Sequence, residues 1–305
     1  MKLNNKSIFL ALSLVPFLSA CGGGGGSSSS SSNDSDSTKI STGNSQTSET
    51  KTCLGFSVIE GSECIETEGR KAFLSNVGSP KGLAILLHGS PGSPEKVSNI
   101  FGMQTLNSDY NFSTLVLKGS DPFWGWNSEV TEENQDNEEV SYITELIDSI
   151  VNDKNIPSNQ VVVMGYSAGG FMAYKLACQI PDKLAGIVSI AGQLRGSISY
   201  CTNSTPLTIH HMHNPQDAEV PVEGGRGISS LDSTLAHFMN VNGCSGQVSE
   251  ASVEGVTISD NKATEISYLD CQKTIKYTKL HNTPHESSYK GEKVLQQLQY
   301  MIGQE

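Results

Sequence analysis

The sequence predicts an α/β fold in which helices cover both faces of a mainly parallel sheet. Short apolar runs alternate with longer segments of helical periodicity from Cys53 to the C-terminus. The run Leu83–Leu87 is continuously apolar and bounded by Gly82 and Gly89, which is typical of a parallel strand buried on both faces. No internal repeat or linker-like stretch interrupts the alternation, so we expect one domain over residues 53–305.

The expected elements follow one another in regular order. Strands are expected at Leu83–Leu87, Thr114–Leu117, Gln160–Met164, Gly186–Ala191, Pro206–His211, Glu265–Leu269 and Ile275–Leu280. Helices are expected around Val140–Ile150 and at Ala168–Gln179, Leu231–Asn240 and Lys290–Ile302. The first of these helices has apolar residues at 3.6-residue spacing and acidic residues just before it, which suit a helix N-terminus.

The N-terminal segment has the features of an export signal. Lys2 and Lys6 precede the apolar run Ile8–Leu18, which is too short to span a bilayer comfortably, so we expect residues 1–20 to be a signal peptide. The sequence Leu18-Ser19-Ala20-Cys21 resembles the bacterial lipobox, which implies that Cys21 is lipid-modified; an ordinary signal peptide cut after Ala20 is the alternative. Residues 21–52 are rich in glycine and serine, which predicts a flexible tether.

Cysteines and charge limit the partners of the domain. Six cysteines remain beyond Cys21, and an even number in an exported domain suggests three disulfides. Spacing favours the pairs Cys53–Cys64, Cys178–Cys201 and Cys244–Cys271, although other connectivities are open. No two of these cysteines have the C-x-x-C spacing of a zinc site. The formal net charge is −12 and no Lys/Arg cluster is present, so we expect no nucleic-acid partner.

Gly165-Tyr166-Ser167-Ala168-Gly169 matches the pattern G-x-S-x-G. An expected strand enters the motif and an expected helix leaves it, which is the strand-turn-helix context of a nucleophile elbow. A serine hydroxyl is a poor nucleophile at neutral pH and needs a histidine base, which in turn needs a carboxylate to orient it. We therefore predict Ser167 as the nucleophile, with the acid and then the base following it in the chain.

The acid and the base have several candidates. Asp217 lies in the turn after an expected strand and is our first candidate for the acid, with Glu219 and then Glu223 as alternatives. His285 follows the expected strand Ile275–Leu280 and precedes the last helix, so it is our first candidate for the base. The alternatives are His281, in the same loop, and His237, within a helical stretch.

The sequence around the motif and after the first expected strand predicts the oxyanion hole and candidate residues of the substrate cleft. The N–H of Ala168 and the N–H of Ser90, after the first strand, are the expected oxyanion donors, since Pro91 has no N–H to offer. His88 is expected to brace this loop. Trp124 and Trp126 either form walls of a substrate cleft or pack their loop against the core.

A group of histidines lies on one expected strand and its following turn. His211 and His213 share a strand face at i, i+2 spacing, so they could ligate a metal at two points. No third ligand is obvious nearby, and a set of packed and hydrogen-bonded histidines that includes His210 is the alternative. We expect neither a metal nor another cofactor.

With these pieces placed, the chain resembles the polyhydroxybutyrate depolymerase and feruloyl esterase group of α/β-hydrolases over residues 68–303. The segments that carry the resemblance are Leu87–Gly89, Phe123–Asn127, Gly165–Ala173, Ile180–Asp182, His213–Gly225 and Asn242–Cys244. The resemblance implies the α/β-hydrolase fold, with Ser167 as nucleophile, Asp217 as acid and His285 as base. The chain departs from the group's pattern at Ser90–Ser93 and on both sides of His285, which affects the oxyanion loop and the substrate preference.

Together these observations predict an exported, lipid-anchored serine esterase that cleaves carboxylic esters through an acyl-enzyme, as the polyhydroxybutyrate depolymerases do. The alternative within this class is a feruloyl or acetyl esterase acting on polysaccharide. Outside the class of ester hydrolases, the alternative hypotheses are a serine peptidase and a non-catalytic binding lipoprotein. The expected partners are a small ester or ester oligomer and the membrane that holds the lipid anchor, at the outer membrane or cell surface, or outside the cell if the protein is released.

Overall fold

A computed structural model describes residues 51–123, 125–134 and 137–303. The predicted signal peptide, the lipid-modified Cys21 and nearly all of the tether lie outside the described residues, so these remain predictions. Residues Glu49–Glu305 group into one compact unit. None of the helices found in the described ranges combines the length and the apolar character that crossing a membrane requires.

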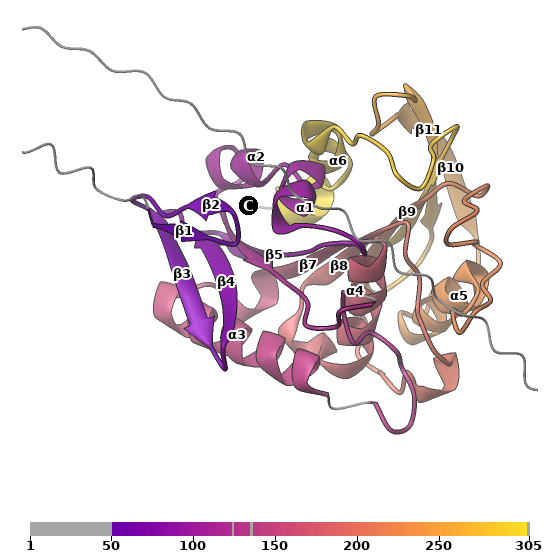
Figure 1. The fold of residues 1–305 in the computed structure, drawn as a ribbon. Helices are drawn as coiled ribbons and strands as arrows, with labels where there is room; N and C mark the ends of the chain where they lie inside the picture. Colours follow the sequence, from indigo (N-terminus) through magenta and orange to yellow (C-terminus); the bar gives the residue numbers. More distant parts are fainter. Residues whose placement is uncertain (1–50, 124, 135–136, 304–305) are drawn as a thin grey trace, which may run out of the picture. The chain divides into compact units, whose positions relative to one another are not determined.

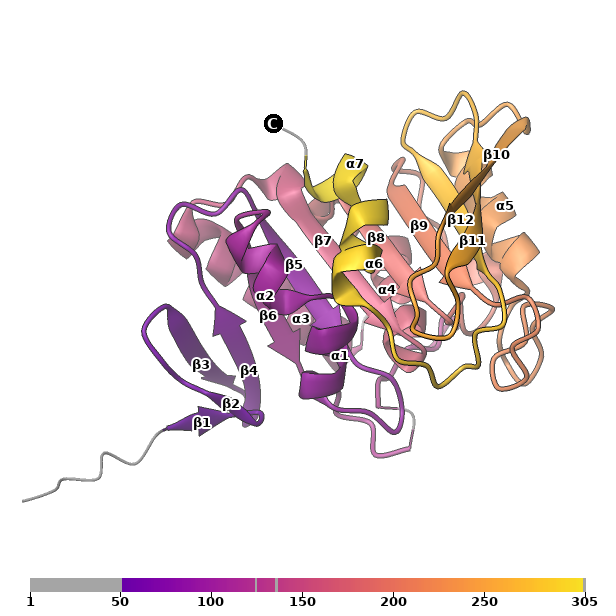
Figure 2. The same cartoon turned by 90° about the horizontal axis from the view of Figure 1, so that it is seen from above.

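The central element of this unit is a sheet that has ten strands in the described residues, in the order β10-β11-β12-β9-β8-β7-β5-β6-β4-β3 (Figures 1 and 2). The six middle strands are parallel: β6 (Phe112–Leu117), β5 (Gly82–Leu87), β7 (Val161–Tyr166), β8 (Gly186–Ile190), β9 (Thr208–His213) and β12 (Ile275–Leu280). Antiparallel strands extend both edges: β4 (Arg70–Ser75) with β3 (Ser62–Thr67), and β11 (Lys262–Tyr268) with β10 (Val248–Glu254). β1 (Thr52–Cys53) and β2 (Phe56–Ser57) form a separate small hairpin.

Helices cover both faces of the sheet (Figures 1 and 2). One face carries α1 (Pro94–Ile100), α2 (Met103–Ser108), α6 (Gly291–Gln297) and α7 (Gln299–Ile302), and the other carries α3 (Glu138–Lys154), α4 (Ala168–Gln179) and α5 (Leu231–Val241). Short 3₁₀ turns lie at Ser158–Gln160, Pro181–Lys183 and Ile198–Tyr200. Every residue of β5 is buried, with Leu83 and Ile85 in one core and Ala84 and Leu86 in the other. The predicted α/β-hydrolase fold, with its mainly parallel sheet, is confirmed.

The observed bounds of several elements differ by a few residues from those expected, and two elements differ in more than their bounds. The last helix is divided at Leu298 into α6 and α7. The late strand near Glu265–Leu269 begins earlier, at Lys262, and runs antiparallel to β12. The sequence between these two strands is a short turn, Leu269–Thr274, which can join antiparallel neighbours but is too short for a parallel crossover.

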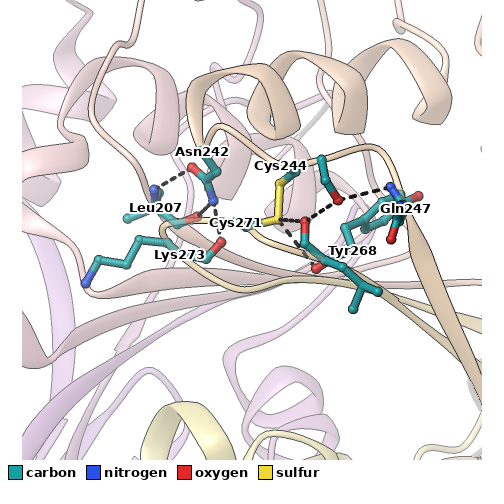
Figure 3. Close-up of a disulfide and its surroundings, with 9 residues drawn as sticks. Leu207, Asn242, Cys244, Gln247, Tyr268, Cys271 and Lys273 are labelled. Carbon is teal, nitrogen blue, oxygen red and sulfur yellow. Dashed lines mark hydrogen bonds between the residues drawn. A yellow bond between two sulfur atoms is a disulfide. The ribbon is translucent and has the colours of Figure 1, made fainter.

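Three disulfides lie in the described residues: Cys53–Cys64, Cys178–Cys201 and Cys244–Cys271. These are the pairs that the sequence spacing favoured. The first joins the small hairpin to β3, and the second joins the end of α4 to the segment that leads into β9. The third, shown in Figure 3, joins the end of α5 to the turn between β11 and β12.

Beside this disulfide, the Asn242 side chain at the end of α5 binds both the turn between β11 and β12 and the residue that precedes β9 (Figure 3). Its Oδ1 accepts a hydrogen bond from the Leu207 N–H at 3.0 Å, and its Nδ2 donates to the carbonyl oxygens of Leu207 at 2.9 Å and Lys273 at 2.8 Å. Asn242 is fully buried, so no solvent replaces these partners if the amide is removed. One amide group therefore ties the start of β9 to the end of α5 and to the β11–β12 turn.

We expect Asn242→Ala to lower the free energy of unfolding by about 3 kcal/mol, because it leaves several buried backbone groups without partners. Urea denaturation with the disulfides intact measures this loss. Asn240→Ala is the matched control: that side chain is exposed on the same helix, and its removal should change the unfolding free energy by no more than about 0.5 kcal/mol. Equal denaturation midpoints for the two variants would contradict the role given to the amide.

Candidate active site

The turn between β7 and α4 places Ser167 at the carboxyl end of the sheet. Ser167 has φ 53° and ψ −116°, a conformation that is unfavourable for a residue with a side chain. Glycines on either side make this turn possible: a Cβ on Gly165 would lie 2.0 Å from the Gly169 carbonyl oxygen, and one on Gly169 would lie 2.0 Å from that of Leu87. The turn therefore has both the strain and the small flanking residues of a nucleophile elbow.

The structure brings Ser167, His285 and Asp217 into one hydrogen-bonded chain. Ser167 Oγ lies 2.9 Å from His285 Nε2, and His285 Nδ1 lies 2.6 Å from Asp217 Oδ2. Asp217 is in the loop after β9 and His285 is in the loop after β12, so both come from carboxyl ends of parallel strands. The exposed fractions of Ser167, Asp217 and His285 are only 6%, 6% and 8%. This arrangement can remove the serine proton and stabilise the imidazolium that results.

The Asp217 carboxylate is fully engaged in hydrogen bonds. Its Oδ1 accepts the backbone N–H groups of Glu219 and Val220, each at 2.9 Å, and its Oδ2 accepts from His285 and from His213 Nε2, the latter at 3.2 Å. Burial alone would raise the pKa of Asp217, but the hydrogen bonds from His213, His285 and Val220 outweigh it and lower the pKa below its ordinary value. The side chain is therefore an anion at neutral pH.

The loop after β5 lies against the nucleophile. A Cβ on Gly89 would lie 3.2 Å from Ser167 Cβ, so this loop approaches the serine more closely than a larger residue would allow. Ser90 Oγ donates to the Phe123 carbonyl oxygen at 2.9 Å, which ties the loop to the segment after β6. Ala168 is the first residue of α4, where the N–H has no acceptor within the helix. Both backbone groups predicted as oxyanion donors thus belong to segments that border Ser167.

Two comparisons with known proteins bear on this site. Residues 75–246 match the family model described as phospholipase/carboxylesterase. The chain belongs to that family. Among curated carboxylesterase relatives, feruloyl esterase D of Neurospora crassa is 25% identical over 56% of this chain and 52% of its own length. The bifunctional acetylxylan esterase/xylanase XynS20E of Neocallimastix patriciarum is 23% identical over 70% of this chain and 30% of its own length, so the matches span about half or less of these relatives.

Solved structures agree with the carboxylesterase family on the fold. The acetyl xylan esterase from Aspergillus awamori superimposes with a TM-score of 0.55 at 14% identity, over 79% of this chain and 98% of that chain. At this identity the likeness shows the fold alone, which is the α/β-hydrolase fold.

The alternative acids and bases are not part of the hydrogen-bonded chain. The side chains of Glu219 and Glu223 are exposed. His281 is exposed and its Nε2 lies 3.0 Å from Thr264 Oγ1. His237 lies on α5, packed against Phe238.

The structure tests the prediction for only one of the two tryptophans. Trp126 is fully buried, and its Nε1 donates to the His88 carbonyl oxygen at 2.7 Å. It is therefore a core residue that packs its loop, and its prediction as a cleft wall is wrong, because a side chain without exposed surface cannot meet a substrate. Trp124 lies outside the described residues.

The His88 ring bridges the loops that follow β5 and β6. Its Nδ1 lies 2.7 Å from the Gly89 carbonyl oxygen, and its Nε2 accepts the Gly119 N–H at 3.1 Å. Burial lowers the pKa of His88, which favours the neutral ring that this donor and acceptor pattern requires.

The histidines of β9 hydrogen-bond to protein groups. His210 Nε2 lies 2.8 Å from Thr278 Oγ1, and His211 Nε2 lies 3.1 Å from His213 Nδ1. Among the described residues no group of three or more histidines, cysteines and carboxylates is placed to hold a metal ion. The arrangement corresponds to the packed and hydrogen-bonded alternative.

Sequence reasoning missed the residues that hold the His285 loop. Tyr166, just before the nucleophile, donates its hydroxyl to the His285 carbonyl oxygen at 2.7 Å and lies 3.1 Å from Glu286 Oε1. Glu286 also pairs with Lys96 of α1. The only signal in the sequence is the position of Tyr166 inside the motif, since its partner lies 119 residues further along the chain.

Proposed function

We propose that this protein is a serine carboxylesterase that works through an acyl-enzyme. The observation that carries the proposal is the chain of hydrogen bonds from Ser167 through His285 to Asp217, at 2.9 Å and 2.6 Å, on a strained elbow. Membership of the phospholipase/carboxylesterase family supports the same chemistry.

In the proposed reaction, Ser167 Oγ attacks the ester carbonyl carbon while His285 Nε2 takes the hydroxyl proton. The negative charge that develops on the carbonyl oxygen is stabilised by the N–H groups of Ala168 and Ser90. His285 then passes its proton to the departing alcohol, which leaves the acyl group on Ser167. A water molecule activated by His285 attacks this acyl-enzyme and releases the acid. Asp217 stabilises the imidazolium in both halves.

Two substrate classes follow from the resemblance and the relatives. Oligomers of hydroxybutyrate are the class implied by the polyhydroxybutyrate depolymerase resemblance. Feruloyl or acetyl esters of polysaccharide are the class named in the curated relatives, and we favour this second class. Phe123 supports it, because the ring is 82% exposed and its backbone is bound to Ser90 in the oxyanion loop. An exposed ring in that place offers a flat apolar face to an aromatic acyl group.

We also propose that the domain is exported and anchored by lipid on Cys21, through the tether of residues 21–52. Three disulfides in the described residues support export, since such bonds persist in oxidising compartments. Metabolic labelling with a fatty acid tests the anchor: Cys21→Ala should lose the label and be released from the membrane fraction.

A panel of esters tests the function and the substrate class together: a nitrophenyl acetate, methyl ferulate, acetylated xylan oligosaccharides and hydroxybutyrate oligomers. We expect kcat/KM to be highest for the feruloyl or acetyl polysaccharide esters. If the acyl group is aromatic, Phe123→Ala should raise KM for methyl ferulate about tenfold while leaving nitrophenyl acetate unchanged. Preference for the hydroxybutyrate oligomers would instead select the first class, and no turnover of any ester would reject the proposed function.

A further inference from the structure

The acid of the proposed triad is shared between two histidines. Besides His285, the side chain of His213 meets Asp217 Oδ2, with Nε2 at 3.2 Å. His213 is fully buried and comes from the last position of β9, four residues before Asp217. Since a carboxylate only accepts hydrogen bonds, His213 must donate through Nε2.

Two buried side chains, His211 and Tyr174, hold His213 in this orientation. His213 Nδ1 lies 3.1 Å from His211 Nε2, and His211 Nδ1 lies 3.1 Å from the Tyr174 hydroxyl. These three side chains are all fully buried. Burial, together with the neighbouring rings of His213 and His210, lowers the pKa of His211 well below its ordinary value, so this ring is neutral and bridges Tyr174 to His213. The chain thus runs from α4 through β9 to the catalytic acid.

We propose that His213, held by His211 and Tyr174, is a positioning residue that fixes the Asp217 carboxylate toward His285. The inference rests on the proposed serine esterase function. The two backbone N–H groups on Oδ1 set one oxygen of the carboxylate, and His213 sets the other.

Other titratable and charged groups face this set, and none of them is replaced in the His213 variants below. They are Tyr166 on β7, Lys96 on α1, Glu219 in the Asp217 loop, Glu286 and Tyr289 in the His285 loop, and His210 on β9. A change in the pH profile on replacing His213 can therefore be assigned to the missing hydrogen bond.

Replacing His213 with glutamine or with asparagine gives two amide side chains that differ in length. In His213→Gln the amide nitrogen takes the place of Nε2 and can still donate to Asp217, while its oxygen accepts from His211. In His213→Asn the amide ends near the position of Nδ1 and cannot reach the carboxylate. We expect His213→Gln to keep kcat within about threefold of wild type, and His213→Asn to lower kcat about 10- to 100-fold with KM unchanged.

The pH profile separates positioning from a merely structural role. Without the His213 hydrogen bond the Asp217 carboxylate can turn away from His285, so the imidazolium loses part of its stabilisation and the acid limb of the profile moves to lower pH in His213→Asn only. His210→Asn is the matched control, because His210 is an equally buried histidine of β9 that binds Thr278 and Tyr300 rather than Asp217. His210→Asn should lower the free energy of unfolding and leave the acid limb of the pH profile at its wild-type position.

The readout is the rate of Ser167 labelling by a fluorophosphonate as a function of pH, together with ester turnover. A His213→Asn protein with the wild-type rate and acid limb overturns the inference, as does a His213→Gln protein that is no better than His213→Asn. If His213→Asn does not fold, Tyr174→Phe removes only the hydroxyl at the far end of the chain and must move the acid limb to lower pH by a smaller amount; an unmoved limb overturns the inference. Failure of the wild-type protein to label would instead reject the proposed function.

Discussion

Ser167→Ala should lower kcat for esters by about 10⁵- to 10⁶-fold, the largest effect expected of any single change in this chain. Alanine keeps the Cβ and therefore the backbone strain of the elbow, but it removes the atom that attacks the ester. The loss of the hydrogen bond to His285 should change the free energy of unfolding by no more than about 1 kcal/mol. Stopped-flow measurements on a nitrophenyl ester should show a burst of nitrophenol in the wild-type protein and none in the variant.

A matched serine makes this test specific. Ser233 is exposed on α5, so Ser233→Ala should keep both the burst and the fluorophosphonate label. If Ser167→Ala turned over esters at the wild-type rate, the nucleophile would be another residue and the proposed mechanism would fail. A wild-type protein that folds but neither labels nor turns over esters would point to a binding protein built on this fold.

The parallel part of the sheet could be predicted from the sequence, whereas of the antiparallel strands at its edges only β11 was expected. β5, β7 and β8 are buried along their whole length, so each leaves a continuous apolar run. β10 shows the opposite case: its seven residues are almost all exposed, and an exposed edge strand leaves no apolar run to recognise. The sequence therefore reveals strands in proportion to their burial on both faces.

For the site, chain order and the strand ends made Ser167, Asp217 and His285 the first candidates among several, and these are the three that lie in one hydrogen-bonded chain. The residues that position these three side chains could not be predicted in the same way, because their contacts depend on the register between strands that are distant in the sequence. His213 was noticed as part of a histidine group, but only the turn after β9 reveals that it faces Asp217. Trp126 illustrates the same limit, since its motif does not tell whether the ring faces the cleft or the core.

Asp217→Asn should lower kcat by about 10⁴-fold, and the hydrogen bonds explain why the substitution is so damaging. Oδ1 accepts the N–H groups of Glu219 and Val220, so the amide oxygen of the asparagine must take that place. Its NH₂ group then replaces Oδ2 and faces His285 Nδ1 and His213 Nε2.

An amide NH₂ only donates, so in Asp217→Asn His285 can keep this contact only with an unprotonated Nδ1. Its proton then lies on Nε2, facing Ser167, where it blocks the base function instead of supplying it. The loss should therefore fall on kcat, while the exposed alternative acid, changed in Glu219→Gln, should leave turnover within about twofold of wild type. The reverse result, a large loss in Glu219→Gln and little in Asp217→Asn, would move the acid of the triad to Glu219. Because both variants change a carboxylate to an amide in one loop, the comparison assigns the loss to the carboxylate that binds His285 and not to negative charge in the loop as such.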